Sequence, residues 1–187
     1  MADTIFTGQT PATDELDFIT HFFGMEFTVS SASDATAGRA WVPAAGRPPT
    51  FFWQLWRVSD TAMLAEVNLN DAGFGTPTAG TWMSFSSSDF ITPGNVALST
   101  GVSYVEGLFS DDGHFVYTGS ASFPIGTGII SSSQGRFKTG GLRTDFPNGT
   151  HSVYGFGDIS VDVAGAAATG LQKILSPVGA VHRAGSW

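Results

Sequence analysis

Five aromatic side chains are the residues of this sequence best suited to contact a ligand. Trp41, Trp53, Trp56, Trp82 and Tyr117 all fall in apolar stretches that predict β-strands. The face of such a ring can stack on the C–H groups of a sugar, and the same ring can anchor a contact between subunits. Large aromatic residues also fill protein cores. The sequence therefore nominates these five residues for a glycan or subunit surface, with the core as the alternative for each.

The stretch 51–58 is the most aromatic of these strands. Period-two alternation places Trp53 on one face and Trp56 on the other, and both have apolar neighbours on their own face. Such a strand is covered on both sides. We expect a second sheet on one side and a loop or a neighbouring subunit on the other, so residues 51–56 are also a candidate interface segment.

Three carboxylates, Glu26, Glu66 and Glu106, fall inside predicted strands. A glycoside hydrolase needs two such groups converging in one cleft, about 5–9.5 Å apart. Here the chain neighbours of each glutamate are apolar or small, so alternation turns the carboxylate away from them. The simpler interpretation is that all three lie on a solvated sheet face. We expect no catalytic pair.

Other catalytic and metal-binding patterns are weak. The sequence contains no cysteine and no G-x-S-x-G motif, and its four histidines do not have metal-ligand spacing. His114 follows Asp111 and Asp112 in a turn-like segment, where capping of the turn is the simpler role. We therefore expect no enzyme activity and no cofactor, with a structural calcium ion on Asp89, Asp111 and Asp112 as the alternative.

The elements that would position these residues are short strands. Helix signals are nearly missing from residues 1–163, and apolar residues alternate in short runs between clusters of Gly, Pro, Ser, Asp and Asn. The pattern predicts an all-β fold, an antiparallel two-sheet sandwich of about eight strands that resembles a jelly roll. The Gly- and Ser-rich stretch 120–150 is expected to be a long loop with one irregular strand at 135–138. The predicted strands are 22–30, 37–42, 51–58, 63–68, 81–90, 103–109, 115–118 and 157–163.

Composition excludes several partners. The chain has 187 residues, with eight Lys+Arg against sixteen Asp+Glu and a formal net charge of −8. Nucleic acids and anionic membranes need clustered basic residues, and this chain has two lysines and scattered arginines. No apolar run is long enough to predict a membrane-spanning helix. The first residues lack the features of a signal peptide, so we expect synthesis in a host cytoplasm without general secretion.

The character of the chain changes after residue 163. A Gly- and Ala-rich linker leads to a segment that carries large apolar residues. We divide the chain into a sandwich domain, 1–163, and a linker with a C-terminal docking tail, 164–187. A frayed end is the alternative, but apolar side chains are costly to leave in water. The candidate docking residues are Leu171, Ile174, Leu175, Val178 and Trp187.

Several short motifs follow one another in an order and spacing that resemble a known family. Gln54-Leu-Trp56 followed by residues 63–65 resembles its hairpin, and residues 24–30 are similar to its first core strand. The family is a bacterial and phage β-sandwich domain of unknown function that looks like a relative of carbohydrate-binding modules. The other matching stretches are 4–6, 10–12, 37–41, 80–85, 96–105, 115–118 and 159–163.

This resemblance covers most of residues 4–163. The family recurs on secreted actinobacterial surface proteins and on virion proteins of the phages that infect those hosts, and it supplies no catalytic residues. Phe51-Phe-Trp53 is more aromatic than the family pattern, and the segment after Ala164 has no counterpart in it. Both departures indicate an added contact surface.

The resemblance and the apolar tail together favour a non-enzymatic structural or adhesion protein of a tailed-phage virion. It would be a capsid decoration, head fibre or minor tail component. Its expected partners are other virion proteins or further copies of itself as a homo-oligomer, with host-surface carbohydrate as a second ligand. The alternative is an extracellular carbohydrate-binding module. A hydrolase on the same scaffold is a third hypothesis, without support from the residues.

Overall fold

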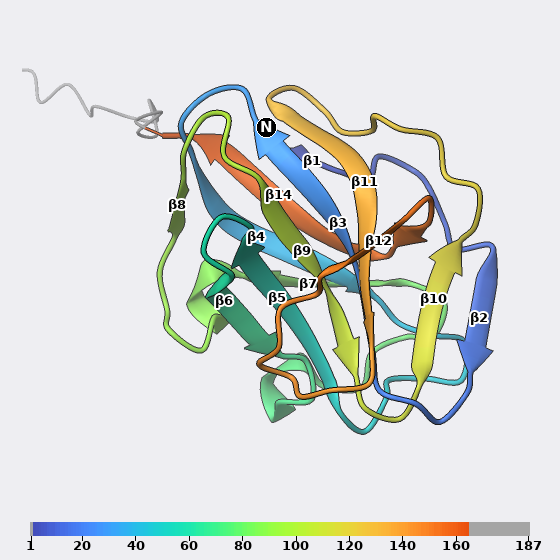
Figure 1. Ribbon diagram of the computed structural model, residues 1–187. Helices are drawn as coiled ribbons and strands as arrows, with labels where there is room; N and C mark the ends of the chain where they lie inside the picture. Colours follow the sequence, from blue (N-terminus) through green and yellow to red (C-terminus); the bar gives the residue numbers. More distant parts are fainter. Residues whose placement is uncertain (1, 165–187) are drawn as a thin grey trace, which may run out of the picture.

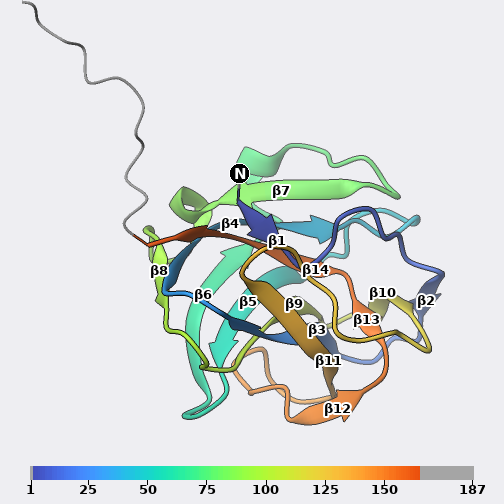
Figure 2. The same cartoon turned by 90° about the horizontal axis from the view of Figure 1, so that it is seen from above.

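The computed structural model describes residues 2–164, except for the side chain of Ala72. These residues form fourteen β-strands, and the only helical turns among them are two 3-10 turns, Ala72–Phe74 and Ser87–Asp89. The strands pair antiparallel and build two facing sheets with a small third sheet at one end (Figures 1 and 2). The predicted all-β, sandwich-like fold is confirmed. No helix in the described part is long and apolar enough to cross a membrane.

The larger sheet carries the most aromatic strands. Its central strands are β3 (His21–Val29), β9 (Tyr104–Ser110) and β5 (Phe51–Arg57). They pair so that Met25 lies opposite Glu106, and Glu106 lies opposite Leu55. Most neighbouring strands in this sheet come from parts of the chain that are far apart in sequence. In order, its strands are β12 (Gly149–His151), β11 (Ile130–Thr139), β3 (His21–Val29), β9 (Tyr104–Ser110), β5 (Phe51–Arg57) and β6 (Ala62–Asn68).

The second sheet joins the two ends of the described chain. Its strands are β1 (Asp3–Thr4), β14 (Gly157–Val163), β4 (Ser33–Trp41) and β7 (Trp82–Ser86), with β8 (Val96–Leu98) also paired to β4. The small third sheet covers one end of the sandwich and lies at the right of Figure 1. It consists of β13 (Tyr154–Gly155), β10 (His114–Thr118) and β2 (Thr13–Leu16).

The main core lies between the two large sheets. Alternate residues of β3, such as Met25 and Phe27, meet alternate residues of β14, such as Ile159 and Val161, and all are buried. The outer face of the larger sheet holds a second apolar cluster of Phe22, Trp56, Val105 and Phe109, against which Phe146 packs. Strand β5 is therefore covered twice. A loop of the same chain covers its outer face, which is one of the two covers predicted from the sequence.

Some strands differ from the prediction. The stretch 120–150 contains a ten-residue strand, β11, which pairs along the whole of β3, where a long loop with a short irregular strand was expected. Its sequence is polar because one face is exposed and the other buries small residues such as Ser132 and Gly135. The prediction also omitted β1, β2, β8, β12 and β13, which have two to four residues each. The predicted strand 81–90 ends at Ser86, where a 3-10 turn begins.

Candidate functional site

Two of the five nominated aromatic residues are core residues. Trp53 is 0% exposed and stacks on Phe90, with ring centroids 5.8 Å apart. Trp56 is 2% exposed and meets the ring of Phe146 edge-on at 5.9 Å. Neither ring can contact a ligand or a second subunit, so both nominations are wrong. Of the candidate interface 51–56 only Phe52 is half-buried rather than buried, and Arg143 lies over its ring at 4.3 Å. The physical reason is the loop around Phe146, which covers the outer face of β5.

Trp41 and Trp82 are half-buried and lie together, with ring centroids 5.4 Å apart and an angle of 85° between them. The guanidinium of Arg39 lies 4.3 Å from the centroid of Trp82, which shields that ring. Trp41 also lines a shallow hollow of about 220 Å³, together with Asp14 and Val116. Of the nominated tryptophans, Trp41 therefore has the position most open to a small ligand.

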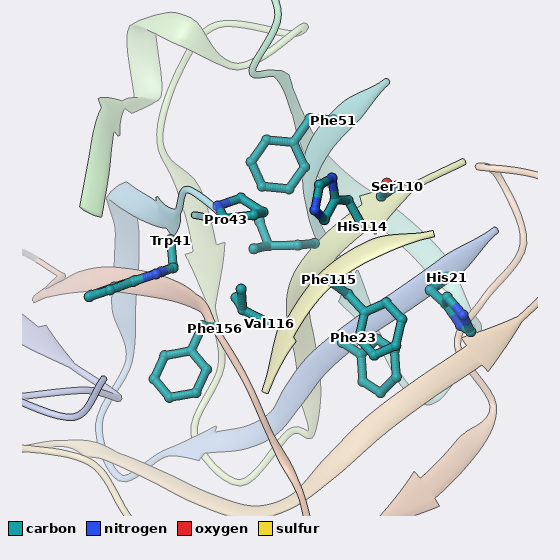
Figure 3. Close-up of a pocket in the computed structure, with 11 residues that line it drawn as sticks. His21, Phe23, Trp41, Pro43, Phe51, Ser110, His114, Phe115, Val116 and Phe156 are labelled. Carbon is teal, nitrogen blue, oxygen red and sulfur yellow. The ribbon is translucent and has the colours of Figure 1, made fainter. Parts of the chain in front are cut away.

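Tyr117 belongs to a different aromatic group. Its ring stacks near those of Phe115 and Phe23, at centroid distances of 5.8 and 6.3 Å, and its hydroxyl donates to Glu15 Oε2 at 3.1 Å. A small apolar pocket opens beside this group, lined by Phe115, Trp41 and others (Figure 3). Its free volume is about 10 Å³, about one water molecule, which leaves no room for a sugar ring.

All three strand glutamates are buried, which corrects the expectation of a solvated face. Glu26 and Glu66 lie on the outer face of the larger sheet, at 8% exposure each. Each is paired there with an arginine: Arg136 Nη2 lies 2.6 Å from Glu26 Oε2, and Arg143 Nη1 lies 2.5 Å from Glu66 Oε2. Glu66 thereby holds the covering loop onto the sheet, whereas Glu26 is paired with β11, a neighbouring strand of the same sheet.

Glu106 points in the opposite direction, into the main core, and is 0% exposed. Trp53 Nε1 donates to its Oε2 at 3.1 Å, while its Oε1 has no hydrogen-bond partner among the described residues. Alternation did separate Glu106 from Val105, as predicted, but Val105 occupies the outer cluster. The prediction failed because Val105 lies on the outer face of the sheet, which is covered as well. The opposite face, to which Glu106 points, is therefore the main core and not solvent.

A second buried carboxyl, Asp158, acts on Glu106. Asp158 accepts hydrogen bonds from the backbone N–H groups of Ile5 and Ile159, both at 2.9 Å, and from Arg39 Nε at 2.9 Å. Burial raises the pKa of Asp158 to about 6, against the attraction of Arg39. Burial and the charge of Asp158 raise the pKa of Glu106 well above its usual value. Both carboxyls of the pair therefore bind protons more readily than they would in water.

This carboxyl pair is sealed from substrate. Glu106 has no exposed surface, and a Cβ at Gly157 would collide with its Oε2, because β14 lies directly over it. A glycoside hydrolase needs carboxyls that touch both the sugar and water. The pair is thus a structural feature of the core, and it does not supply the cleft that the hydrolase hypothesis requires.

The calcium candidates are divided between two turns. Asp89 accepts a hydrogen bond from the Ser86 backbone N–H at 2.8 Å, and Asp112 accepts one from the His114 N–H at 3.2 Å. Both carboxylates therefore cap their own turns. No group of three or more His, Asp or Glu residues in the described part is arranged to hold a metal ion.

Three of the six exposed large apolar side chains among the described residues lie at the end of β2 and in the β2–β3 turn. Leu16, Phe18 and Ile19, which we call the apolar tip, are 42%, 79% and 47% exposed. The turn is held in place: Asp17 Oδ1 accepts from the Ile19 N–H at 2.9 Å, and Asp17 Oδ2 lies 2.7 Å from His21 Nε2. Sequence reasoning missed this surface, although apolar and acidic residues alternate closely at 14–19.

Phe18 adopts a backbone conformation that bulky residues rarely take, with φ of 61°. The β9–β10 turn packs directly against this part of the backbone: a Cβ at Gly113 would collide with the backbone nitrogens of Phe18 and Ile19. Strain of this kind persists where the surroundings fix the backbone, and it concentrates at functional sites. The apolar tip is therefore a preformed surface and the strongest candidate contact site in the described residues.

Neither a scan against protein-family models nor a search of curated proteins finds a match to this chain. The family resemblance therefore stays a prediction. The nominated docking residues Leu171, Ile174, Leu175, Val178 and Trp187 lie outside the described residues. The functional argument consequently depends on the geometry of residues 2–164 and on the sequence that follows them.

Proposed function

We propose that this protein is a non-enzymatic structural component of a tailed-phage virion, a capsid decoration, head fibre or minor tail protein, that works by binding other subunits. The observation that carries the proposal is the apolar tip. Three large apolar side chains stand in solvent on a turn fixed by hydrogen bonds, and apolar side chains gathered in this way mark surfaces that bind another protein.

Two further observations support this proposal. The fold is a sandwich of antiparallel sheets, as the resemblance to phage and surface β-sandwich domains implies. The carboxyls that a hydrolase would use are instead paired with arginines or sealed in the core. A fold by itself carries little functional information, so the tip has more weight than the architecture.

The test is whether the protein is part of particles. Antibodies raised against the protein would be used on phage particles produced in a host that carries this gene and purified on a density gradient. We expect the protein to sediment with intact particles in a constant ratio to the major capsid protein. A protein found only in the soluble fraction of the lysate would refute the proposal.

Carbohydrate binding is a second candidate function, favoured by the hollow beside Trp41. An aromatic ring next to the carboxylate of Asp14 can provide both stacking and a hydrogen-bond acceptor for a sugar. Isothermal titration against a panel of host cell-wall glycans would test it. Binding should be lost in Trp41→Ala and kept in Trp53→Phe, whose ring is buried; no heat from any glycan would remove this function.

A further inference from the structure

We infer that the apolar tip is the acceptor for residues 165–187 of a second copy of this chain, so that subunits join head to tail. This inference rests on the proposed assembly function and identifies its contact surface. It replaces residues 51–56 as the interface, because all of those residues except the half-buried Phe52 are buried within their own subunit.

The first argument is chemical complementarity. The tip is surrounded by carboxylates of its own turn and of the neighbouring β9–β10 turn, which is joined to it by a hydrogen bond from the Asp17 N–H to the Gly113 carbonyl. On the β11 side, Lys138 lies opposite Phe22, and its ammonium forms an ion pair with Asp145 at 3.0 Å. The partner of such a surface must be apolar and basic. The carboxylates of the two turns are Asp14, Glu15, Asp17, Asp111 and Asp112.

Residues 165–187 have this composition. They include Lys173 and Arg183 and no Asp or Glu, because all sixteen acidic residues of the chain precede residue 165. They also supply Leu171, Ile174 and Leu175, which have the large apolar side chains that an exposed phenylalanine and isoleucine would pack against. Opposite charges at such a contact speed association and fix its orientation.

The second argument is distance, which favours a second copy over the same chain. The tip directly precedes His21, the first residue of β3, whereas the Ala164 N–H donates to the Ala32 carbonyl at 3.0 Å, just beyond the other end of β3. In Figures 1 and 2 the ends of β2 and β14 accordingly lie on opposite sides of the molecule. Nine residues of strand span about 30 Å.

The linker is short for that distance. The seven residues that follow Ala164, up to and including Leu171, reach at most about 25 Å when fully extended. The Cα of Leu171 therefore falls short of the tip of its own subunit, and only the residues after it have enough chain to span the distance. A neighbouring subunit can present its tip near Leu171. Contacts between different surfaces of identical subunits generate rings when they close and filaments when they do not.

The experiment measures association of the full-length protein by light scattering and sedimentation over a wide range of concentration. Wild type should form oligomers whose dissociation constant rises with salt, since part of the attraction is between exposed charges. Phe18→Asn removes the most exposed ring, and Asn tolerates the left-handed backbone. It should raise the dissociation constant by about tenfold or more, the effect of losing a central anchor.

The matched control is Ile91→Asn, which removes another exposed apolar side chain, 59% exposed, from a turn beside β6. It should associate as wild type does. Charge reversal adds a second readout: Lys173→Glu with Arg183→Glu should weaken association. Adding Glu15→Lys and Asp111→Lys to that variant should restore it, which a variant that had merely misfolded would not show.

The outcomes separate the inference from the proposed function. A wild-type protein that stays monomeric overturns head-to-tail docking, and the particle experiment then decides the function alone. Oligomers that Phe18→Asn leaves unchanged also overturn the inference, while assembly through another surface stands. Oligomers that weaken in Phe18→Asn, persist in Ile91→Asn and recover in the charge-swapped variant support it.

Discussion

Mild acid should stabilise this domain, because the buried carboxyl pair of Glu106 and Asp158 takes up protons more readily in the folded state. Burial raises the pKa of Asp158 from 3.8 to about 6 and that of Glu106 in the same direction. A carboxyl of this kind contributes stability that is complete below its unfolded pKa and is lost as the pH rises through its folded pKa. Between about pH 4 and about pH 6, stability therefore falls as the pH rises.

The size of the effect follows from Asp158. At about one unit below its folded pKa, near pH 5, the folded carboxyl is mostly protonated and the unfolded one is mostly ionised. The gain in the free energy of unfolding relative to about pH 7.5 is then about 1 kcal/mol. For a domain of this length that gain raises the melting temperature by about 4 °C. Protonation of Glu106 adds to the gain with the same sign.

The assay is urea unfolding, followed by tryptophan fluorescence at several pH values, on wild type and on Asp158→Asn. Burial lowers the pKa of His151, which destabilises the folded state in acid, and comparison of the two proteins removes this contribution. The free energy of unfolding of wild type relative to Asp158→Asn should rise by about 1 kcal/mol on acidification from about pH 7.5 to about pH 5.

Two variants complete the design. Glu106→Gln should also make the free energy of unfolding depend less on pH than it does in wild type, because it removes the other buried carboxyl. Asp60→Asn changes a fully exposed carboxyl whose pKa is lowered by Arg57, so it should not alter the profile in this window. A stability difference between wild type and Asp158→Asn that stays constant or shrinks on acidification would show that the pair is not protonated as inferred.

Three further predictions concern the tip and the covered outer face. Phe18→Asn should raise the free energy of unfolding by about 1 kcal/mol, because it relieves a left-handed bulky residue; calorimetry would detect it. Gly113→Ala should lower the free energy of unfolding by about 2 kcal/mol or more, because the φ of Gly113 is 74° and the added Cβ would collide with the β2–β3 turn. An unchanged melting temperature would contradict this. Arg143→Ala leaves buried Glu66 without its cation and should lower the free energy of unfolding by about 1–2 kcal/mol in chemical unfolding. Arg57→Ala, which removes an exposed ion pair, should leave the unfolding curve almost unchanged.

Periodicity predicted the strands that carry regular apolar alternation. The predicted strand 51–58 corresponds to β5 and the predicted strand 157–163 to β14, within a residue at each end. The full length of strand β11 was not predicted because its residues are mostly Ser, Gln, Gly, Arg and Lys. Its place beside β3 depends on long-range pairing, which local composition does not encode.

Alternation also separated the two faces of each strand without identifying the solvent side. Trp53 and Trp56 do lie on opposite faces, but both faces are covered, and Glu106 is buried for the same reason. The cover of the outer face comes from the loop that carries Arg143 and Phe146, about ninety residues after β5. No local pattern in β5 predicts a cover so distant in sequence. The tip was also not predicted, although its apolar residues stand among acidic ones at 14–19.

The position of β14 has a consequence for how the chain folds. The last strand lies between β1 and β4, so the second sheet cannot be completed until residues 157–163 are available. Until then β4 presents an open edge, on which another chain can add a strand. Pairing across such sequence separations is slow and exposes intermediates to aggregation. Expression at low temperature should therefore give more soluble protein, and fragments that end before Gly157 should be recovered as insoluble material.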